Sequence, residues 1–246
     1  MLRPYIRKTL ARFGFDISRE DSFLLEPEFQ KIFSRCRAFS MASRERLYAV
    51  FQAVQYINAN HIPGDLVECG VWRGGASMVA ALSQMSQGDT SRRIWLYDTF
   101  AGMTSPTAKD VHRWEGRNAR HTWARFERDE HNHWCHANLD EVKQNLFSTG
   151  YPGDRIEFVQ GDVNETLASG GPDRIAVLRL DTDWYDSTKI ELERLYPRLP
   201  IGGVLIVDDY GVWNGARQAV DEYFEKEDVK ILLQRTDYTG RMGLKL

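Results

Sequence analysis

The sequence predicts an α/β fold, a mostly parallel, Rossmann-like sheet with helices on both faces. Between residues 65 and 224, short apolar runs typical of buried strands alternate with stretches at helical spacing. This alternation is typical of parallel sheets whose strands are joined by helical crossovers. The chain then closes with two strand-like runs, VKILLQRT and RMGLKL, joined by the turn DYTG. Such a terminal hairpin places one antiparallel strand in the otherwise parallel sheet.

The elements are expected in a regular order along the chain. A helix begins at Ser43, carries apolar residues on one face, and ends before Pro63 and Gly64. Strands are then expected at 65–70, 93–98, 155–162, 175–181 and 202–209, and helices at 75–85, 187–196 and 216–224.

The alternation is interrupted once, between residues 99 and 138. This segment holds three of the tryptophans and five of the six histidines. It is too long for an ordinary connection within a compact domain. We therefore expect a lid-like insertion at about 103–138 that covers a site.

Length and composition predict one catalytic-size domain. A chain of 246 residues with 42% hydrophobic content can bury a single sizeable core. We expect an N-terminal helical arm over 1–42 and the domain over 43–246. The arm starts with MLRPYIRKTLARFGF, whose basic and apolar residues form an amphipathic pattern at helical spacing. Packing on the body or on a second subunit is favoured over a membrane surface, because one short helix binds membranes weakly.

The net charge indicates the class of partner, and the cysteine content indicates the cellular compartment. A net charge of −3 lacks the positive field that nucleic acid requires, so the expected partner is a small molecule. No apolar stretch approaches the roughly 20 residues of a transmembrane helix. The three cysteines show no paired spacing, which indicates a reducing, cytoplasmic environment.

Acidic residues accompany nearly every expected strand. Glu68 lies within the first strand, and the later strands end at Asp98, Asp162, Asp181, and the pair Asp208 and Asp209. In open α/β sheets, ligands bind outside the carboxyl ends of the parallel strands. The acids therefore predict a binding site along one edge of the sheet.

The first three strand ends indicate a nucleoside-containing cofactor. In VECGVWRGGAS, Gly70 permits close approach of the backbone and Ser77 lies at a helix start, although a plain tight turn also fits. Asp98 is placed to accept hydrogen bonds from both ribose hydroxyls. Asp162 either lies beside an adenine or caps the helix that follows. Without a phosphate cradle, this set suits S-adenosylmethionine better than NAD or ATP.

The acids of the next two strands predict a metal site. Asp181, Asp208 and Asp209 end neighbouring strands, which lie roughly 4.8 Å apart. Three carboxylates so close repel one another unless a cation lies between them, although capping of the following helices is an alternative. Oxygen ligands without His or Cys favour Mg²⁺.

Asp183 is the candidate general base. It follows Asp181 by two residues and projects to the same side if the chain stays extended. An aspartate of ordinary pKa is a feeble base toward an alcohol, so the proposal also requires a metal that acidifies the hydroxyl.

A rival metal site is the stretch HNHWCH at 131–136, which offers imidazoles and a thiol within a short span. Its spacing fits no familiar structural zinc site. Solvated or pocket-lining roles are favoured instead, with flat tryptophan faces stacking on a sugar or aromatic acceptor.

Five blocks resemble the macrocin O-methyltransferase family, whose members methylate sugar hydroxyls on macrolide and aminocoumarin antibiotics. They are MASRERL (41–47), IPGDLVECGVWRGGAS (62–77), LYDTFAGM (96–103), AVLRLDTDWYDST (176–188) and GGVLIVDDYG (202–211). The resemblance implies a class I S-adenosylmethionine- and Mg²⁺-dependent O-methyltransferase acting on a small-molecule hydroxyl. It also implies a seven-stranded sheet with a reversed last strand, and a homo-oligomer.

The resemblance assigns roles to individual residues. It implies metal ligands at Asp181, Asp208 and Asp209, a general base at Asp183, Glu68 at the methionine end of the cofactor and Asp98 at its ribose. The 103–138 segment and the ending GRMGLKL depart from the family pattern, so the acceptor is not implied in detail. An NAD-dependent oxidoreductase and a non-catalytic binding protein of the same fold are the alternatives.

Overall fold

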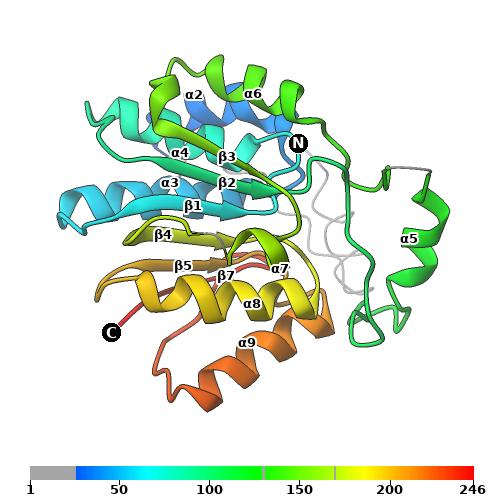
Figure 1. The fold of residues 1–246 in the computed structure, drawn as a ribbon. Helices are drawn as coiled ribbons and strands as arrows, with labels where there is room; N and C mark the ends of the chain where they lie inside the picture. Colours follow the sequence, from blue (N-terminus) through cyan, green and yellow to red (C-terminus); the bar gives the residue numbers. More distant parts are fainter. Residues whose placement is uncertain (1–25, 129–130, 169) are drawn as a thin grey trace, which may run out of the picture.

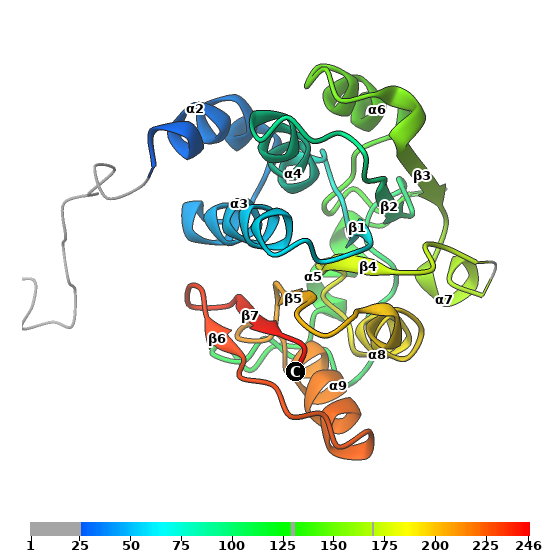
Figure 2. The same ribbon diagram turned by 90° about the vertical axis from the view of Figure 1, so that its left-hand side faces the viewer.

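The computed structural model describes residues 26–128, 131–168 and 170–246. The basic amphipathic helix expected at the start of the chain lies outside these residues. The described part is a central sheet between two layers of helices, as Figures 1 and 2 show. The predicted α/β class is confirmed.

The described residues form a seven-stranded sheet in the order β3-β2-β1-β4-β5-β7-β6. Neighbouring strands from β3 to β5 pair in parallel, whereas β7 is antiparallel to both β5 and β6. The expected terminal hairpin and the reversed last strand are therefore confirmed. The strands are β1 (Asp65–Cys69), β2 (Ile94–Asp98), β3 (Ile156–Gln160), β4 (Ile175–Leu180), β5 (Val204–Val207), β6 (Gln234–Arg235) and β7 (Arg241–Leu244).

The helices cover both faces of the sheet (Figure 2). On one face lie α2 (Pro27–Cys36), α3 (Arg44–Ala59), α4 (Gly75–Ser86) and α6 (Leu139–Phe147), and on the other α7 (Val163–Thr166), α8 (Tyr185–Leu195) and α9 (Asn214–Lys226). Short 3₁₀ turns occupy Arg37–Phe39, Gly153–Arg155 and Tyr196–Arg198.

Apolar side chains fill the space on each face of the sheet. Val54 of α3 is among the fully buried residues of one cluster, and Leu178 of β4 and Leu192 of α8 belong to the other. All six residues of β4 are buried, which explains its nearly continuous apolar run. Burial on both faces holds the strand ends, and hence the acids, in fixed positions.

Helix α2 had no separate place among the expected elements, because it falls within the predicted N-terminal arm. Its signal is the apolar spacing of Phe29, Ile32, Phe33 and Cys36, which lie on one face of a helix. The Phe29 ring lies 5.4 Å from that of Phe51 in α3. Residues 27–36 are thus part of the main hydrophobic core.

The 103–138 segment extends beyond the carboxyl edge of the sheet and carries α5 (Arg120–Phe126), as Figure 1 shows. Several hydrogen bonds tie it to the rest of the chain. The Asn132 amide donates to the Ala101 carbonyl at 2.9 Å, and His112 forms an isolated bridge with Trp213. Gly102 permits the first contact, because a side chain there would overlap the Asn132 carbonyl.

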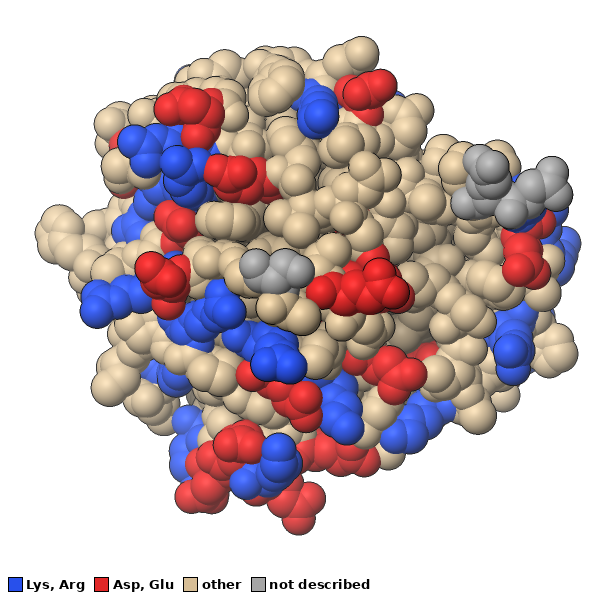
Figure 3. All heavy atoms as spheres, in the orientation of Figure 1, with Lys and Arg blue, Asp and Glu red and all other residues tan. Residues whose placement is uncertain are grey.

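Positive and negative side chains are interspersed on the face shown in Figure 3, with no broad area of one sign. Within the described residues, no helix combines the length and the apolar character that crossing a membrane requires.

Candidate active site

A pocket of about 310 Å³ lies at the carboxyl edge of the sheet. It brings together almost all of the sequence-predicted site residues. Those that line it are Glu68, Gly70, Asp98, Asp162, Asp181, Asp183, Asp208 and Asp209. Ser77 instead lies behind the pocket, where its buried hydroxyl donates a hydrogen bond to the Glu68 carboxylate.

The ends of β4 and β5 assemble the predicted acidic trio. Asp181, Asp208 and Asp209 each offer a carboxylate oxygen, and these atoms lie within 4.8 Å of one another. Asp208 and Asp209 are buried, whereas the Asp181 side chain is 29% exposed toward the pocket side of the trio. The Asp209 Oδ2 atom is buried without a hydrogen-bond partner among the described residues.

Two arginines offset part of this negative charge, and sequence reasoning missed both. The Arg179 guanidinium lies 2.8 Å from Asp181 Oδ2 and 2.7 Å from Asp208 Oδ1, and it also pairs with Glu68. Arg46 of α3 pairs with the other oxygen of Asp208. One of them, Arg179, had a signal in the sequence, because it is the single charged residue in the otherwise apolar run of β4. A buried charge must be paired, so this arginine indicates acidic partners nearby.

The arginines divide the acids into two electrostatic classes. Burial alone would raise the pKa of Asp208, but the charges of Arg179 and Arg46 lower it below its ordinary value. Burial, together with the neighbouring carboxylates, raises the pKa of Asp181 and of Asp209 well above the usual range. A divalent cation at the trio would favour the ionised forms of all three.

Asp183 lies beside the trio by a different backbone path from the one expected. Its φ of 68° is in the left-handed region, so the chain does not continue extended after β4. The side chain nevertheless lines the pocket and hydrogen-bonds with the Trp213 side chain. Burial and the charge of Asp181 raise the pKa of Asp183 to about 7, which is suited to proton transfer near neutral pH.

At the other end of the pocket, Asp98 holds the loop after β1 in place. Its Oδ2 accepts from the Val71 and Trp72 amides at 2.6 and 3.1 Å, and its Oδ1 accepts from the Phe100 amide at 2.7 Å. Gly70 has a φ of 82°, and a side chain there would overlap the Asp181 carbonyl. The first turn is thus pressed against the end of β4.

Asp162 has the capping role considered from sequence, and it also lines the pocket where the cofactor is expected. It is the N-cap of α7, and its side chain accepts from the Asn164 amide at 2.9 Å. Asp162 can cap α7 and line the pocket at once, because it lies between the end of β3 and the start of α7, at the edge of the sheet.

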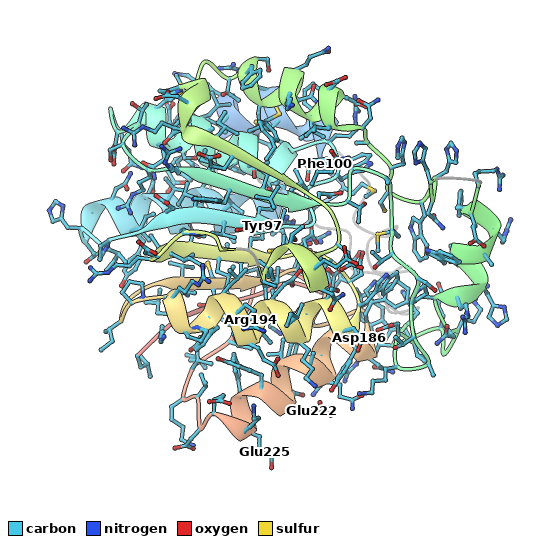
Figure 4. All side chains as sticks on the ribbon, in the orientation of Figure 1. Tyr97, Phe100, Asp186, Arg194, Glu222 and Glu225 are labelled. Atoms are coloured by element: carbon cyan, nitrogen blue, oxygen red, sulfur yellow. The ribbon has the colours of Figure 1, made fainter. Side chains whose placement is uncertain are left out.

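The histidine-rich stretch does not form the rival metal centre among the described residues. The His131 and His136 rings stack at 5.3 Å, and the His133 ring lies 5.7 Å from His136. In residues 26–128, 131–168 and 170–246, however, the one group of three ligands close enough to share an ion is the aspartate trio. Asp186, the third acid of the LRLDTDWYDST motif, is exposed on the first turn of α8, as Figure 4 shows.

Glu191 is a fully buried acid below the site. Its carboxylate accepts from the Thr182 hydroxyl at 2.9 Å, and its second oxygen has no partner among the described residues. Burial raises the pKa of Glu191 well above its ordinary value, which the Thr182 hydrogen bond opposes. The folded state therefore binds this proton more tightly than the unfolded state does.

We expect Glu191→Gln to stabilise the protein increasingly as pH rises. Above the unfolded pKa of about 4.3, wild-type stability falls until pH passes the folded pKa, and the neutral glutamine lacks this loss. The expected gain is at least about 1 kcal/mol at pH 8. Urea unfolding between pH 5 and pH 8 measures it, with the exposed Glu193→Gln on the same helix as control. A pH-independent difference between Glu191→Gln and wild type would contradict the expectation.

Comparison with known proteins adds evidence of a different kind. The Macrocin-O-methyltransferase (TylF) family model matches residues 34–242. A Streptomyces olivaceus protein, 8-demethyl-8-(2,3-dimethoxy-alpha-L-rhamnosyl)-tetracenomycin-C 4'-O-methyltransferase, is 36% identical over 203 residues, 82% of this chain and 74% of that protein. Demethyldecarbamoylnovobiocin O-methyltransferase of Streptomyces niveus is 33% identical over the same shares.

Solved structures of methyltransferases also resemble this chain. The structure of the O-methyltransferase NovP superposes with a TM-score of 0.74 at 31% identity, covering 84% of this chain and 82% of that one. A calicheamicin methyltransferase, at 18% identity and a TM-score of 0.60 over 95% of both chains, shares the fold.

Proposed function

This chain belongs to the macrocin O-methyltransferase family and is an O-methyltransferase, and we propose that it methylates a hydroxyl on a sugar or glycosylated small molecule. The proposal includes S-adenosylmethionine as methyl donor and Mg²⁺ as the metal. The observation that carries it is one pocket holding Asp98 at one end and Asp183 with the aspartate trio at the other. The name of the Streptomyces olivaceus relative specifies a rhamnosyl-bearing acceptor, and that of the Streptomyces niveus relative specifies demethyldecarbamoylnovobiocin.

The cofactor would occupy the end of the pocket formed by β1, β2 and β3. We assign Glu68 to the methionine end, Asp98 to the ribose and Asp162 to the adenine, with Gly70 allowing close approach. All four line the pocket. Ser77 acts through Glu68, because its hydroxyl donates to that carboxylate.

The residues at the other end fit a magnesium ion. Three carboxylates offer oxygens within 4.8 Å, and the orphaned Asp209 Oδ2 is a buried acceptor that needs a partner. Mg²⁺ prefers such hard oxygen ligands. We therefore assign Asp181, Asp208 and Asp209 as its ligands. When bound, the ion lowers the pKa of a hydroxyl that contacts it.

The chain's own residues then supply proton transfer and orientation. Asp183 accepts the proton of the acceptor hydroxyl at its carboxylate, and the Trp213 side chain holds Asp183 by a hydrogen bond. Arg179 keeps Glu68, Asp181 and Asp208 in fixed relation, because its guanidinium pairs with all three. S-adenosylmethionine supplies a methyl group on a good leaving group, so alignment of the hydroxyl provides much of the rate.

The remaining expectations stay part of this proposal. Residues 1–42 would form an N-terminal arm, residues 43–246 the methyltransferase domain, and residues 103–138 a lid-like insertion. A homo-oligomer and a cytoplasmic location complete it; the first follows from the family resemblance and the second from three cysteines without paired spacing.

Isothermal titration calorimetry with S-adenosylhomocysteine and with NAD tests the cofactor assignment. We expect saturable one-to-one binding of S-adenosylhomocysteine and no heat from NAD, because the described residues that line the pocket do not form a G-x-G-x-x-G phosphate turn. The titration is done at 150 mM salt, with Glu68→Gln as a variant expected to bind more weakly. Binding of NAD instead would support an oxidoreductase and overturn the assignment.

A further inference from the structure

Three tryptophan rings meet beside Asp183. Trp134 comes from the 103–138 segment, Trp184 precedes α8 and Trp213 precedes α9. The Trp184 and Trp213 ring centroids lie 5.1 Å apart, those of Trp134 and Trp184 5.7 Å, and those of Trp134 and Trp213 6.3 Å. Trp134 and Trp213 line the pocket, while Trp184 is only 2% exposed. We propose that this aromatic corner is the acceptor subsite, and that it binds the apolar face of a neutral pyranose ring.

The corner is fixed before any acceptor arrives. The Trp184 indole donates to the Thr104 carbonyl at 2.9 Å, which ties the base of α8 to the chain leaving β2. The Met103 amide donates to the Trp134 carbonyl at 3.2 Å. Because the Trp184 and Trp213 indoles are held by hydrogen bonds to Thr104 and Asp183, binding costs little ordering of these two side chains.

The corner also stands next to the residue assigned as general base. The Trp213 side chain hydrogen-bonds with Asp183, and both line the same pocket as Asp209. A saccharide ring packed on the indoles therefore has its hydroxyl-bearing edge beside the carboxylates. The inference rests on the proposed function in this respect, since it assigns that reaction's acceptor position.

The geometry of the three rings suits a puckered saccharide ring. The ring planes cross at 65°, 66° and 71° rather than lying parallel. A pyranose presents C–H bonds in several directions, so it can contact the crossed faces of Trp134 and Trp213 at the same time. Indole faces are large, rigid and apolar, which suits such contacts.

Charge favours a neutral acceptor. Among the described residues that line the pocket, the Lys and Arg side chains are Arg46 and Arg179. Both are already paired with carboxylates: Arg46 with Asp208 and Asp237, and Arg179 with the cluster described above. A phosphate or carboxylate on the bound ring would thus meet a site whose cations are engaged and whose remaining groups are acidic.

Saturation-transfer NMR on the protein loaded with S-adenosylhomocysteine and Mg²⁺ tests the subsite, with methyl α-L-rhamnopyranoside as probe. We expect transfer from the tryptophan ring protons to the sugar C–H protons in the wild type. Trp134→Leu should weaken binding of the probe about tenfold, while Trp134→Phe, which keeps an aromatic face, should lose less. Trp114→Leu is the matched control, because Trp114 is 57% exposed on the same segment and does not line the pocket.

Three results would overturn the inference. They are no transfer in the wild type, equal probe affinity in Trp134→Leu and Trp134→Phe, or methylation of catechol in preference to the rhamnoside. Calorimetry with S-adenosylhomocysteine on each variant distinguishes failure of the acceptor subsite from failure of the proposed function. If the cofactor product binds wild type and Trp134→Leu equally while any of these results appears, the acceptor subsite is wrong and the cofactor assignment stands.

Discussion

Replacing Asp183 by asparagine is expected to lower kcat by about 10²- to 10⁴-fold, the usual contribution of a general base. The amide keeps the shape of the side chain and its place beside Trp213, but it cannot accept the hydroxyl proton. S-adenosylhomocysteine should bind with unchanged affinity, because Asp183 is not among the residues assigned to the cofactor. Single-turnover methyl transfer from labelled S-adenosylmethionine measures the chemical step.

Asp186→Asn is the matched control for this variant. Asp186 follows in the same motif but is exposed on α8, away from the pocket lining (Figure 4). We expect its kcat to stay within twofold of wild type. If Asp183→Asn retained full single-turnover activity, the proton would have to leave by another route, and the assignment of Asp183 would fail.

Removing the metal is expected to lower activity at least as much as Asp183→Asn does. Excess EDTA should abolish turnover, and Mg²⁺ added beyond the chelator should restore it, because the acceptor hydroxyl then regains the ion that lowers its pKa. Asp209→Asn should weaken Mg²⁺ binding at least about a hundredfold, since one of three charged ligands is lost. Calorimetric titration with MgCl₂ measures this directly, independent of turnover.

Asp209 is a sharper choice than Asp208 for this test. Both oxygens of Asp208 pair with arginines, so Asp208→Asn would remove one buried partner from each of Arg46 and Arg179 and lower the folding stability as well as metal binding. Asp209 Oδ2 has no such partner among the described residues. Glu225→Gln, at an exposed position on α9, serves as control. Full activity of the wild type in excess EDTA would refute the metal assignment.

The succession of strands and helices along the chain, and the placement of the acids at the strand ends, were predictable from the sequence alone. Buried parallel strands are marked by short apolar runs, and a residue that ends such a run must stand at the sheet edge. Asp98, Asp162, Asp181 and Asp208 therefore fell into one pocket as expected. The physical reason is that the spacing of apolar residues, and the point at which an apolar run ends, are set by neighbouring residues in the sequence.

Tertiary structure alone decided how the charges and rings of the site are paired. Arg46 meets Asp208 across 162 positions of the chain, and Trp184 donates to Thr104 across 80. The left-handed conformation of Asp183 likewise departs from the extended backbone that the spacing of the two aspartates predicted. Contacts of this kind arise when distant segments are brought to one sheet edge, so no periodicity in the sequence records them.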